Sequence, residues 1–179
     1  SLKDENDGAV ISCIIWKSNY SLFGIELEVG MKIMATGAPN IYAPSGRLSF
    51  IGDVIELAGE GALKKEYERL KKQLTQEGLF APERKRPVKN YPQRIGVITS
   101  KQGSVIADFL SNIGSFGFKI KMIDSRVEGQ EAVADLLHSI KTFAKHNLDA
   151  LVIIRGGGSL ESMMAFNNEK VVRAVANFP

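Results

Sequence analysis

Apolar runs broken by short polar stretches occupy the first third of the chain. The segments 9–16, 31–39 and 46–57 are rich in Ile, Val and Phe and are separated by Gly, Pro, Asn and Ser, a pattern typical of strands. Alternating apolar and polar positions in the second and third segments indicate strands with one face toward solvent. The predicted turns lie at Gly30, at Gly37 with Pro39, and at Pro44–Gly46. Residues 1–60 thus predict a small antiparallel β unit, too short to close a five-stranded barrel by itself.

The spacing of apolar residues changes at Gly61. Leu63, Tyr67, Leu70 and Leu74 follow one another at intervals of 4, 3 and 4 residues among Lys and Glu, which predicts an amphipathic helix. After Gly78, the segment 79–92 contains three prolines and cannot continue a helix. Residues 61–92 are therefore predicted to be a helical and basic connector.

Residues 93–179 alternate between apolar strands and amphipathic helices. Strands are predicted at 94–99, 119–123 and 150–154, with helices in 100–113 and 129–146. The third strand is apolar throughout, as expected of a strand covered on both faces. This order predicts an open, doubly wound parallel α/β sheet, incomplete in this chain. The predicted core face of the second helix consists of Val133, Leu136, Leu137, Ile140 and Phe143.

Composition excludes several classes of protein. Of the 179 residues, 44% are hydrophobic and 24% are charged, which suits a soluble globular protein. The apolar runs are far shorter than the ~20 residues of a membrane helix, and the first ten residues lack the pattern of an export signal. The single cysteine, Cys13, is predicted to be a buried strand residue and fits a reducing compartment. We therefore expect a cytoplasmic protein without a membrane partner.

Positive charge is concentrated in the middle of the chain. Residues 1–60 contain 4 Lys/Arg and 8 Asp/Glu, residues 61–94 contain 10 and 4, and residues 95–179 contain 9 and 8. A basic connector favours a polyanion, because Lys and Arg that contact phosphates release counterions. The alternative is a solvated helix face followed by a charged linker. The candidate phosphate contacts are Arg84, Lys85, Arg86 and Lys89.

Candidate chemistry follows the carboxyl ends of the three strands, where ligands bind in an open parallel sheet. The loops 99–104, 125–130 and 155–159 combine Gly with hydroxyl or cationic residues, and we expect them to meet at one edge. The candidate phosphate-binding residues of the first and third loops are Thr99, Ser100, Gly103, Ser104, Gly156, Gly157, Gly158 and Ser159.

The third loop is the most informative of the three. Its consecutive glycines permit positive φ and close approach of a ligand, and Ser159 is positioned to cap a following helix. Arg155 precedes them, and a guanidinium suits a phosphodiester. The alternative is a tight turn in which Arg155 pairs with Asp108 or Glu161. Neither a dinucleotide-binding fingerprint nor a P-loop is present.

The other titratable residues are weaker candidates for functional roles. Asp108 follows Ser104 by four residues, so its carboxylate could face the ligand edge or simply be a surface acid. His138 and His146 lie on or after the second helix, away from the loops, and are predicted to be structural or exposed. No zinc site and no Ser/His/Asp triad can be assembled.

Taken in order, these motifs resemble one family. The segments Gly59–Leu63, Tyr91–Ser100 with Gly103 and Asp108, and Arg155–Glu161 followed by Ala165–Asn167 are similar to the large subunit of exodeoxyribonuclease VII, over nearly the whole chain. The resemblance implies an OB-fold that binds single-stranded DNA, a catalytic domain, and hydrolysis of single strands from both ends into oligonucleotides. It also implies a small-subunit partner, bound through a C-terminal region absent here.

The resemblance assigns the family's essential Asp to Asp108 and its essential Arg to Arg155. The family's His and Asp, in a GHExD-type motif, would follow Pro179, so we expect an internal fragment that is inactive by itself. Ser162 is a departure, because the family usually has Asp there. A divalent metal such as Mg²⁺ is left open as a cofactor, with no ligands assigned. Aromatic residues that could stack bases, although a core role is expected for each, are Trp16, Tyr20, Phe23 and Tyr42.

Two other functions remain open. A single-strand-binding module without catalysis would need neither Asp108 nor Arg155. A flavodoxin-like enzyme acting on nucleotides or sugar phosphates would use the 155–159 loop for a small ligand and would not need the basic connector.

Overall fold

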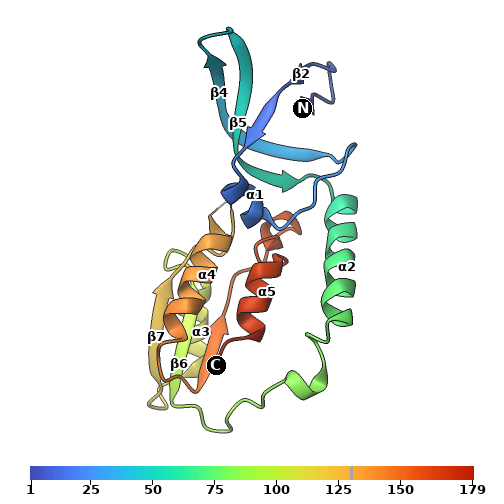
Figure 1. Cartoon of the computed structure of the whole chain (residues 1–179). Helices are drawn as coiled ribbons and strands as arrows, with labels where there is room; N and C mark the ends of the chain where they lie inside the picture. The colour runs from blue at the N-terminus through green and yellow to red at the C-terminus, as the bar shows by residue number, and fades with distance from the viewer. Residues whose placement is uncertain (130) are drawn as a thin grey trace. The chain divides into compact units, whose positions relative to one another are not determined.

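The structure is a computed structural model that describes residues 1–129 and 131–179. The chain forms two compact units, Ser1–Leu63 and Lys64–Pro179, whose elements are labelled in Figure 1. The finer division at residues 60 and 92 stays a prediction.

The first unit consists mainly of two long strands and three short ones. A pair of antiparallel strands, β1 (Leu2–Lys3) and β2 (Val10–Ile11), precedes a three-stranded sheet of order β3-β5-β4. In that sheet β4 (Ile33–Tyr42) and β5 (Arg47–Leu57) are antiparallel, whereas β3 (Cys13–Ile15) runs parallel to β5. The described strands form no closed barrel.

The predicted strands of this unit are present, with local differences. The expected strand 9–16 is interrupted at Ser12, whose carbonyl accepts the N–H of Phe50 (2.7 Å). Gly37 is not in a turn: it lies inside β4 at a shift of register, and a Cβ there would overlap the carbonyl of Ile51. Gly30 and Gly46 do adopt positive φ, 91° and 65°, in turns.

Side chains predicted to be buried in this unit are partly exposed. The Trp16 and Tyr42 side chains are 62% and 61% exposed, so the core role expected for them is wrong. Cys13 is half-buried rather than buried. Trp16 precedes a short helix, α1 (Lys17–Phe23), that the strand pattern did not predict. Because the rings of Trp16 and Tyr42 are exposed, they are accessible for stacking with bases, and this role stays a prediction.

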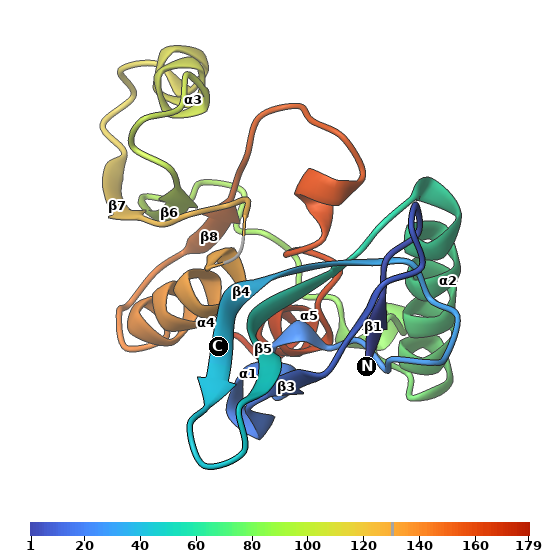
Figure 2. The ribbon, with the colours of Figure 1, turned by 90° about the horizontal axis from the view of Figure 1, so that it is seen from above.

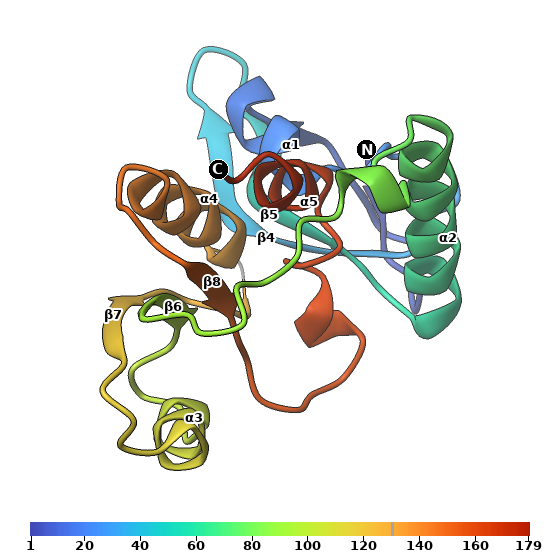
Figure 3. The ribbon, with the colours of Figure 1, turned by 90° about the horizontal axis from the view of Figure 1, so that it is seen from below.

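The second unit contains the predicted parallel sheet. Its strands are β6 (Arg94–Thr99), β7 (Lys119–Asp124) and β8 (Ala150–Ile153), in the order β7-β6-β8, with both pairs parallel. Helices α3 (Val105–Ile113) and α4 (Ala132–Phe143) lie on opposite faces of the sheet (Figures 2 and 3). The doubly wound arrangement is confirmed. Helix α2 (Glu60–Gln76), the short 3-10 turns η1 (Pro82–Arg84) and η2 (Glu161–Met163), and α5 (Glu169–Ala176) complete the elements.

The core lies between β6 and α4. Leu136, Ile140 and Phe143 of α4 pack with Ile98, as the apolar spacing of that helix predicted. Gly96 permits this approach, because a Cβ there would lie 2.5 Å from Cδ1 of Leu148. Strand β8 is half-buried along its length, because among the described strands it lies at an edge of the sheet.

Helix α2 presents the predicted apolar face. Leu70 and Leu74 are buried together with Leu79 and pack against Val172 and Ala176 of α5. In the described part of the chain, no helix combines the length and hydrophobicity needed to cross a membrane.

Candidate phosphate-binding site at the sheet edge

The three loops that follow the parallel strands contact one another. The backbone N–H of Lys101 donates to Oδ1 of Asp124 (2.8 Å), which connects the first loop to the end of β7. The N–H of Ser125 donates to the carbonyl of Thr99 (3.0 Å). Arg155 of the third loop pairs with Glu128 of the second (3.1 Å). The structure therefore brings the loops to one edge, as parallel strand ends require; Gln130, the last residue of the second loop, lies outside the described residues.

Arg155 is the most constrained side chain of this edge. It is only 9% exposed. Its Nη1 donates to Oγ of Ser162 (2.8 Å), and its Nη2 donates to Glu128 and to the carbonyl of Gly157 (3.0 Å). Its Nε is buried without a hydrogen-bond partner in the described structure. A guanidinium has five N–H groups, so these contacts fix its orientation and leave donor capacity for an anion.

The partner of Arg155 differs from the sequence-based alternative. That alternative paired Arg155 with Asp108 or Glu161, whereas the carboxylate that contacts it belongs to Glu128, whose side chain is 63% exposed. Glu161 instead accepts from its own backbone N–H and from the hydroxyl of Ser159, and both bonds lower its pKa. Since Glu128 is largely in water, its attraction for Arg155 is screened and weak.

The glycines of the third loop do not have the backbone conformation that was expected of them. None of Gly156, Gly157 and Gly158 has positive φ. Instead, a Cβ on Gly158 would overlap Nη2 of Arg155 and Oγ of Ser162, and a Cβ on Gly156 would lie 3.3 Å from Cγ2 of Val105. A side chain at Gly158 would thus displace Arg155 or Ser162, and one at Gly156 would press against Val105 of α3.

Ser159 does not cap a helix. The loop leads into η2, which is preceded by Leu160 without a side-chain cap, and the cap of α5 is Asn168. The carbonyl of Ser159 accepts the hydroxyl of Ser162 (2.7 Å). Ser162 therefore connects the loop backbone to the guanidinium of Arg155.

The first loop and α3 place the remaining candidates. Thr99 is buried under the loop, whereas Gly103 and Ser104 are exposed. Ser100 Oγ accepts the N–H of Gln102 (3.3 Å). Asp108 is exposed in the first turn of α3, and its carboxylate forms no hydrogen bond or ion pair with the described residues. The geometry leaves Asp108 available to a ligand but does not join it to Arg155.

The basic connector divides into paired and unpaired cations. Lys89 donates to Oδ1 of Asp149 (2.6 Å), and Arg84 contacts Asn177 (3.4 Å). Lys85 and Arg86 are exposed and form no ion pair with residues that the structure describes. Lys85 and Arg86 are therefore the connector cations with the least competition for a phosphate.

Asp149 lies directly before β8, at the end of the sheet opposite the loop edge, and binds Lys89 of the basic connector. Its carboxylate is 5% exposed and accepts from Lys89, from the guanidinium of Arg94 (2.8 Å), and from the backbone N–H groups of Gln93 and Arg94. The bond with Arg94 is the main cause that holds the pKa of Asp149 well below its ordinary value, followed by that with Lys89. Asp149 is remote in the sheet from Arg155, because it precedes the strand that Arg155 follows.

The described residues give no basis for a protein-held metal. Residues 1–129 and 131–179 contain no group of three or more His, Cys, Asp or Glu side chains arranged to bind one. His138 and His146 are exposed on and after α4, in agreement with the prediction.

Sequence reasoning missed three residues of the edge: Asp124, Glu128 and Ser162. Asp124 ends β7, where a polar residue after an apolar strand was a usable signal. Ser162 stood out only as a departure from the family pattern. No sequence signal pairs Glu128 with Arg155, because their contact depends on the packing of two loops.

Comparisons with known proteins agree with the resemblance. The family described as "Exonuclease VII, large subunit" matches residues 79–179, and an "OB-fold nucleic acid binding domain" matches residues 1–56. The exodeoxyribonuclease 7 large subunits of Streptococcus pneumoniae serotype 2 (strain D39) and Streptococcus thermophilus (strain LMD-9) are each 42% identical to this chain over 178 residues. Each match covers 98% of this chain, which spans about 40% of the length of those relatives.

Proposed function

The chain belongs to the exonuclease VII large-subunit family, and on this premise we propose that it contributes a single-stranded-DNA-binding unit and part of a phosphodiester-hydrolysing site to that enzyme. The proposed reaction degrades single strands from both ends into oligonucleotides, in the cytoplasm and together with a small subunit. The relatives carry the name exodeoxyribonuclease 7 large subunit.

The fixed orientation of the Arg155 guanidinium is the observation that supports a catalytic site at the loop edge. A phosphodiester gains negative charge as it is attacked, and a donor fixed beforehand stabilises that charge without reorganising. Ser162 and the carbonyl of Gly157 fix the Arg155 fork at hydrogen-bond distance. We propose that Arg155 contacts the scissile phosphate and that Asp108 orients another group or accepts a proton.

Phosphate binding around Arg155 is proposed for the exposed backbone of the loops. Gly157, Gly158 and Gly103 present no side chain, so a strand's phosphates can approach their N–H groups closely. Ser100, Ser104 and Ser159 add hydroxyl donors at the same edge. The unpaired Lys85 and Arg86 extend the positive charge along the strand.

Substitutions in the complete large subunit, assembled with its small subunit, test this proposal. Arg155→Lys should restore only part of the activity lost in Arg155→Ala, because an ammonium does not reproduce the planar fork. Asp108→Asn should lower turnover and leave affinity for single strands equal or higher, because a negative charge near the phosphates is removed. Lys141→Ala, an exposed cation on α4, is the matched control and should change neither quantity.

A binding module without catalysis is the second candidate, because Asp108 and Arg155 have no contact with each other in the structure. If both neutralised variants cleave single strands at the wild-type rate, that function replaces the nuclease proposal.

A further inference from the structure

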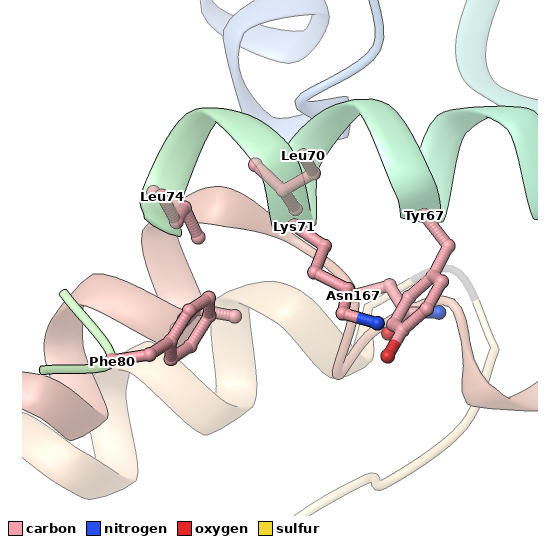
Figure 4. A pocket seen from close by; sticks show the side chains of 7 residues that line it. Tyr67, Leu70, Lys71, Leu74, Phe80 and Asn167 are labelled. Atoms are coloured by element: carbon pink, nitrogen blue, oxygen red, sulfur yellow. The ribbon is translucent and has the colours of Figure 1, made fainter. Parts of the chain in front are cut away.

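A small hollow opens in the second unit beside α2 (Figure 4). Leu70 and Leu74 of α2 and Val172 of α5 line its apolar interior. Leu70 and Leu74 belong to the buried cluster between the two helices, and Val172 packs against it. The volume of the hollow is about 70 Å³, which suits one inserted ring rather than a helix of a partner protein.

Two aromatic rings stand at this hollow and remain half-exposed. Tyr67 follows the apolar spacing of α2, yet its side chain is 43% exposed, as is that of Phe80 in the segment after the helix. Leu63, Leu70 and Leu74 on the same face are buried. Aromatic rings left in water beside a concave apolar surface are typical of binding sites.

The polar groups at the hollow suit a base and a phosphate. Lys71 Nζ lies over one face of the Tyr67 ring, 5.5 Å from its centroid, which leaves the other face for a base. Asn167 lies beside Tyr67 in Figure 4, and its amide makes no hydrogen bond with the described residues. An amide offers both a donor and an acceptor, which matches the edge of a nucleobase.

The charge around the hollow is also favourable for a nucleic acid. No carboxylate is among the residues that line it. Glu77 after α2 and Glu169 on α5 share one cation, Arg173, at 2.7 Å each, so one of their two negative charges is balanced. A polyanion therefore meets Lys71 without a competing acid in the lining.

We propose that this hollow binds a nucleobase of single-stranded DNA. The base stacks on the exposed ring of Tyr67 with Phe80 beside it, its edge meets Asn167, and Lys71 contacts a neighbouring phosphate. Stacking on aromatic residues tolerates any sequence because every base has a π-face, as an enzyme that degrades strands of all sequences requires. This inference rests on the proposed function, since it assigns one contact of the same substrate outside the loop edge.

Binding to two fluorescent oligonucleotides tests the inference in this chain. One is oligothymidylate, and the other has the same length and charge with abasic residues in place of the bases. Tyr67→Ala and Phe80→Ala should each weaken binding of oligothymidylate by roughly 5- to 100-fold, the range for losing one base–aromatic stack. Binding of the abasic strand should change by less than about twofold, because its phosphates remain. Tyr67→Phe keeps the ring and should bind like the wild type.

Phe116→Ala is the matched control, because Phe116 is an exposed ring (81%) of the same unit that does not line the hollow. It should leave both affinities unchanged. Equal losses on both strands in Tyr67→Ala, or no loss on either, would overturn the base contact. So would a Tyr67→Ala variant that binds DNA normally but loses self-association, since the occupant would then be a second copy. If the wild type binds neither strand, the proposed function itself fails.

Discussion

Substituting Gly158 with alanine tests whether the packing of the third loop positions Arg155. A Cβ at this position would overlap Nη2 of Arg155 and Oγ of Ser162 and would lie 3.1 Å from Nη1 of Arg155. Both neighbours are the ends of flexible side chains, so the side chains move while the backbone stays. The guanidinium is expected to leave Ser162 and turn toward solvent.

The size of the effect follows from the contacts that are lost. The hydrogen bond from Arg155 Nη1 to Ser162 Oγ is 2.8 Å long. A hydrogen bond to a charged group contributes about 1.5–3 kcal/mol to stability. Because the displaced guanidinium is hydrated again, we expect the free energy of unfolding to fall by less than about 1.5 kcal/mol. Removing a preorganised donor typically costs on the order of 10²–10³ in rate, so displacing one should cost roughly 10- to 100-fold.

Gly61→Ala is the matched control for this prediction, because Gly61 lies in α2 outside the loop edge. A Cβ at Gly61 has no heavy atom within 4 Å, and neither glycine has positive φ. Single-turnover cleavage of a labelled single strand by the assembled enzyme, with urea unfolding in parallel, compares the two variants. If both lower the rate equally, or if Gly158→Ala cleaves like the wild type, the packing of the loop does not position Arg155.

Three further predictions concern the connector and the core. Asp149→Asn should lower the free energy of unfolding at pH 7 and make it depend less on pH in the acid range. Because the pKa of Asp149 is depressed in the folded state, the stability that its carboxylate contributes is present above the unfolded pKa of about 3.9 and is lost as the pH falls below that value. Urea midpoints that fall in parallel for variant and wild type from pH 7 to pH 3 would contradict this. Alanine at Arg84, Lys85, Arg86 and Lys89 together should flatten the salt dependence of single-strand binding, by roughly 0.7 in log–log slope per lost phosphate contact; an unchanged slope refutes a role in binding, and Lys85 with Arg86 should account for most of the change. Leu74→Ala, at a side chain that is 1% exposed, should lower the free energy of unfolding by about 2–5 kcal/mol, whereas Leu110→Ala, at an exposed position on α3, should cost far less.

The fold of the second unit was largely predictable because its signals are local. The apolar strands, the spacing along α4 and the polar strand ends specify a parallel sheet and its ligand edge. The edge position of β8 was not predictable, because an apolar sequence does not reveal whether a neighbouring strand covers it. In the first unit, Gly37 has the composition of a turn residue, yet close approach of Ile51 places it inside β4.

The site was predictable in outline and not in its contacts. The sequence predicts Arg155 at the loop edge, because its place directly after an apolar strand determines where its backbone lies. Its partners Glu128 and Ser162 depend on how two loops pack, which no local pattern encodes. The same limit applies to Tyr67, whose helical spacing indicates a core residue while the neighbouring hollow leaves its ring exposed.

The most direct test of the proposed nuclease site compares cleavage and binding in one variant, Arg155→Ala. Single-turnover cleavage and equilibrium binding of the same labelled single strand are measured with the complete large subunit and its small subunit. Loss of a preorganised hydrogen-bond donor should lower the cleavage rate by a factor on the order of 10²–10³. The affinity for the strand should change by less than about fivefold, because only one phosphate contact among several is lost. A rate equal to that of the wild type, or a rate that falls only in proportion to affinity, would contradict a role for Arg155 in the chemistry.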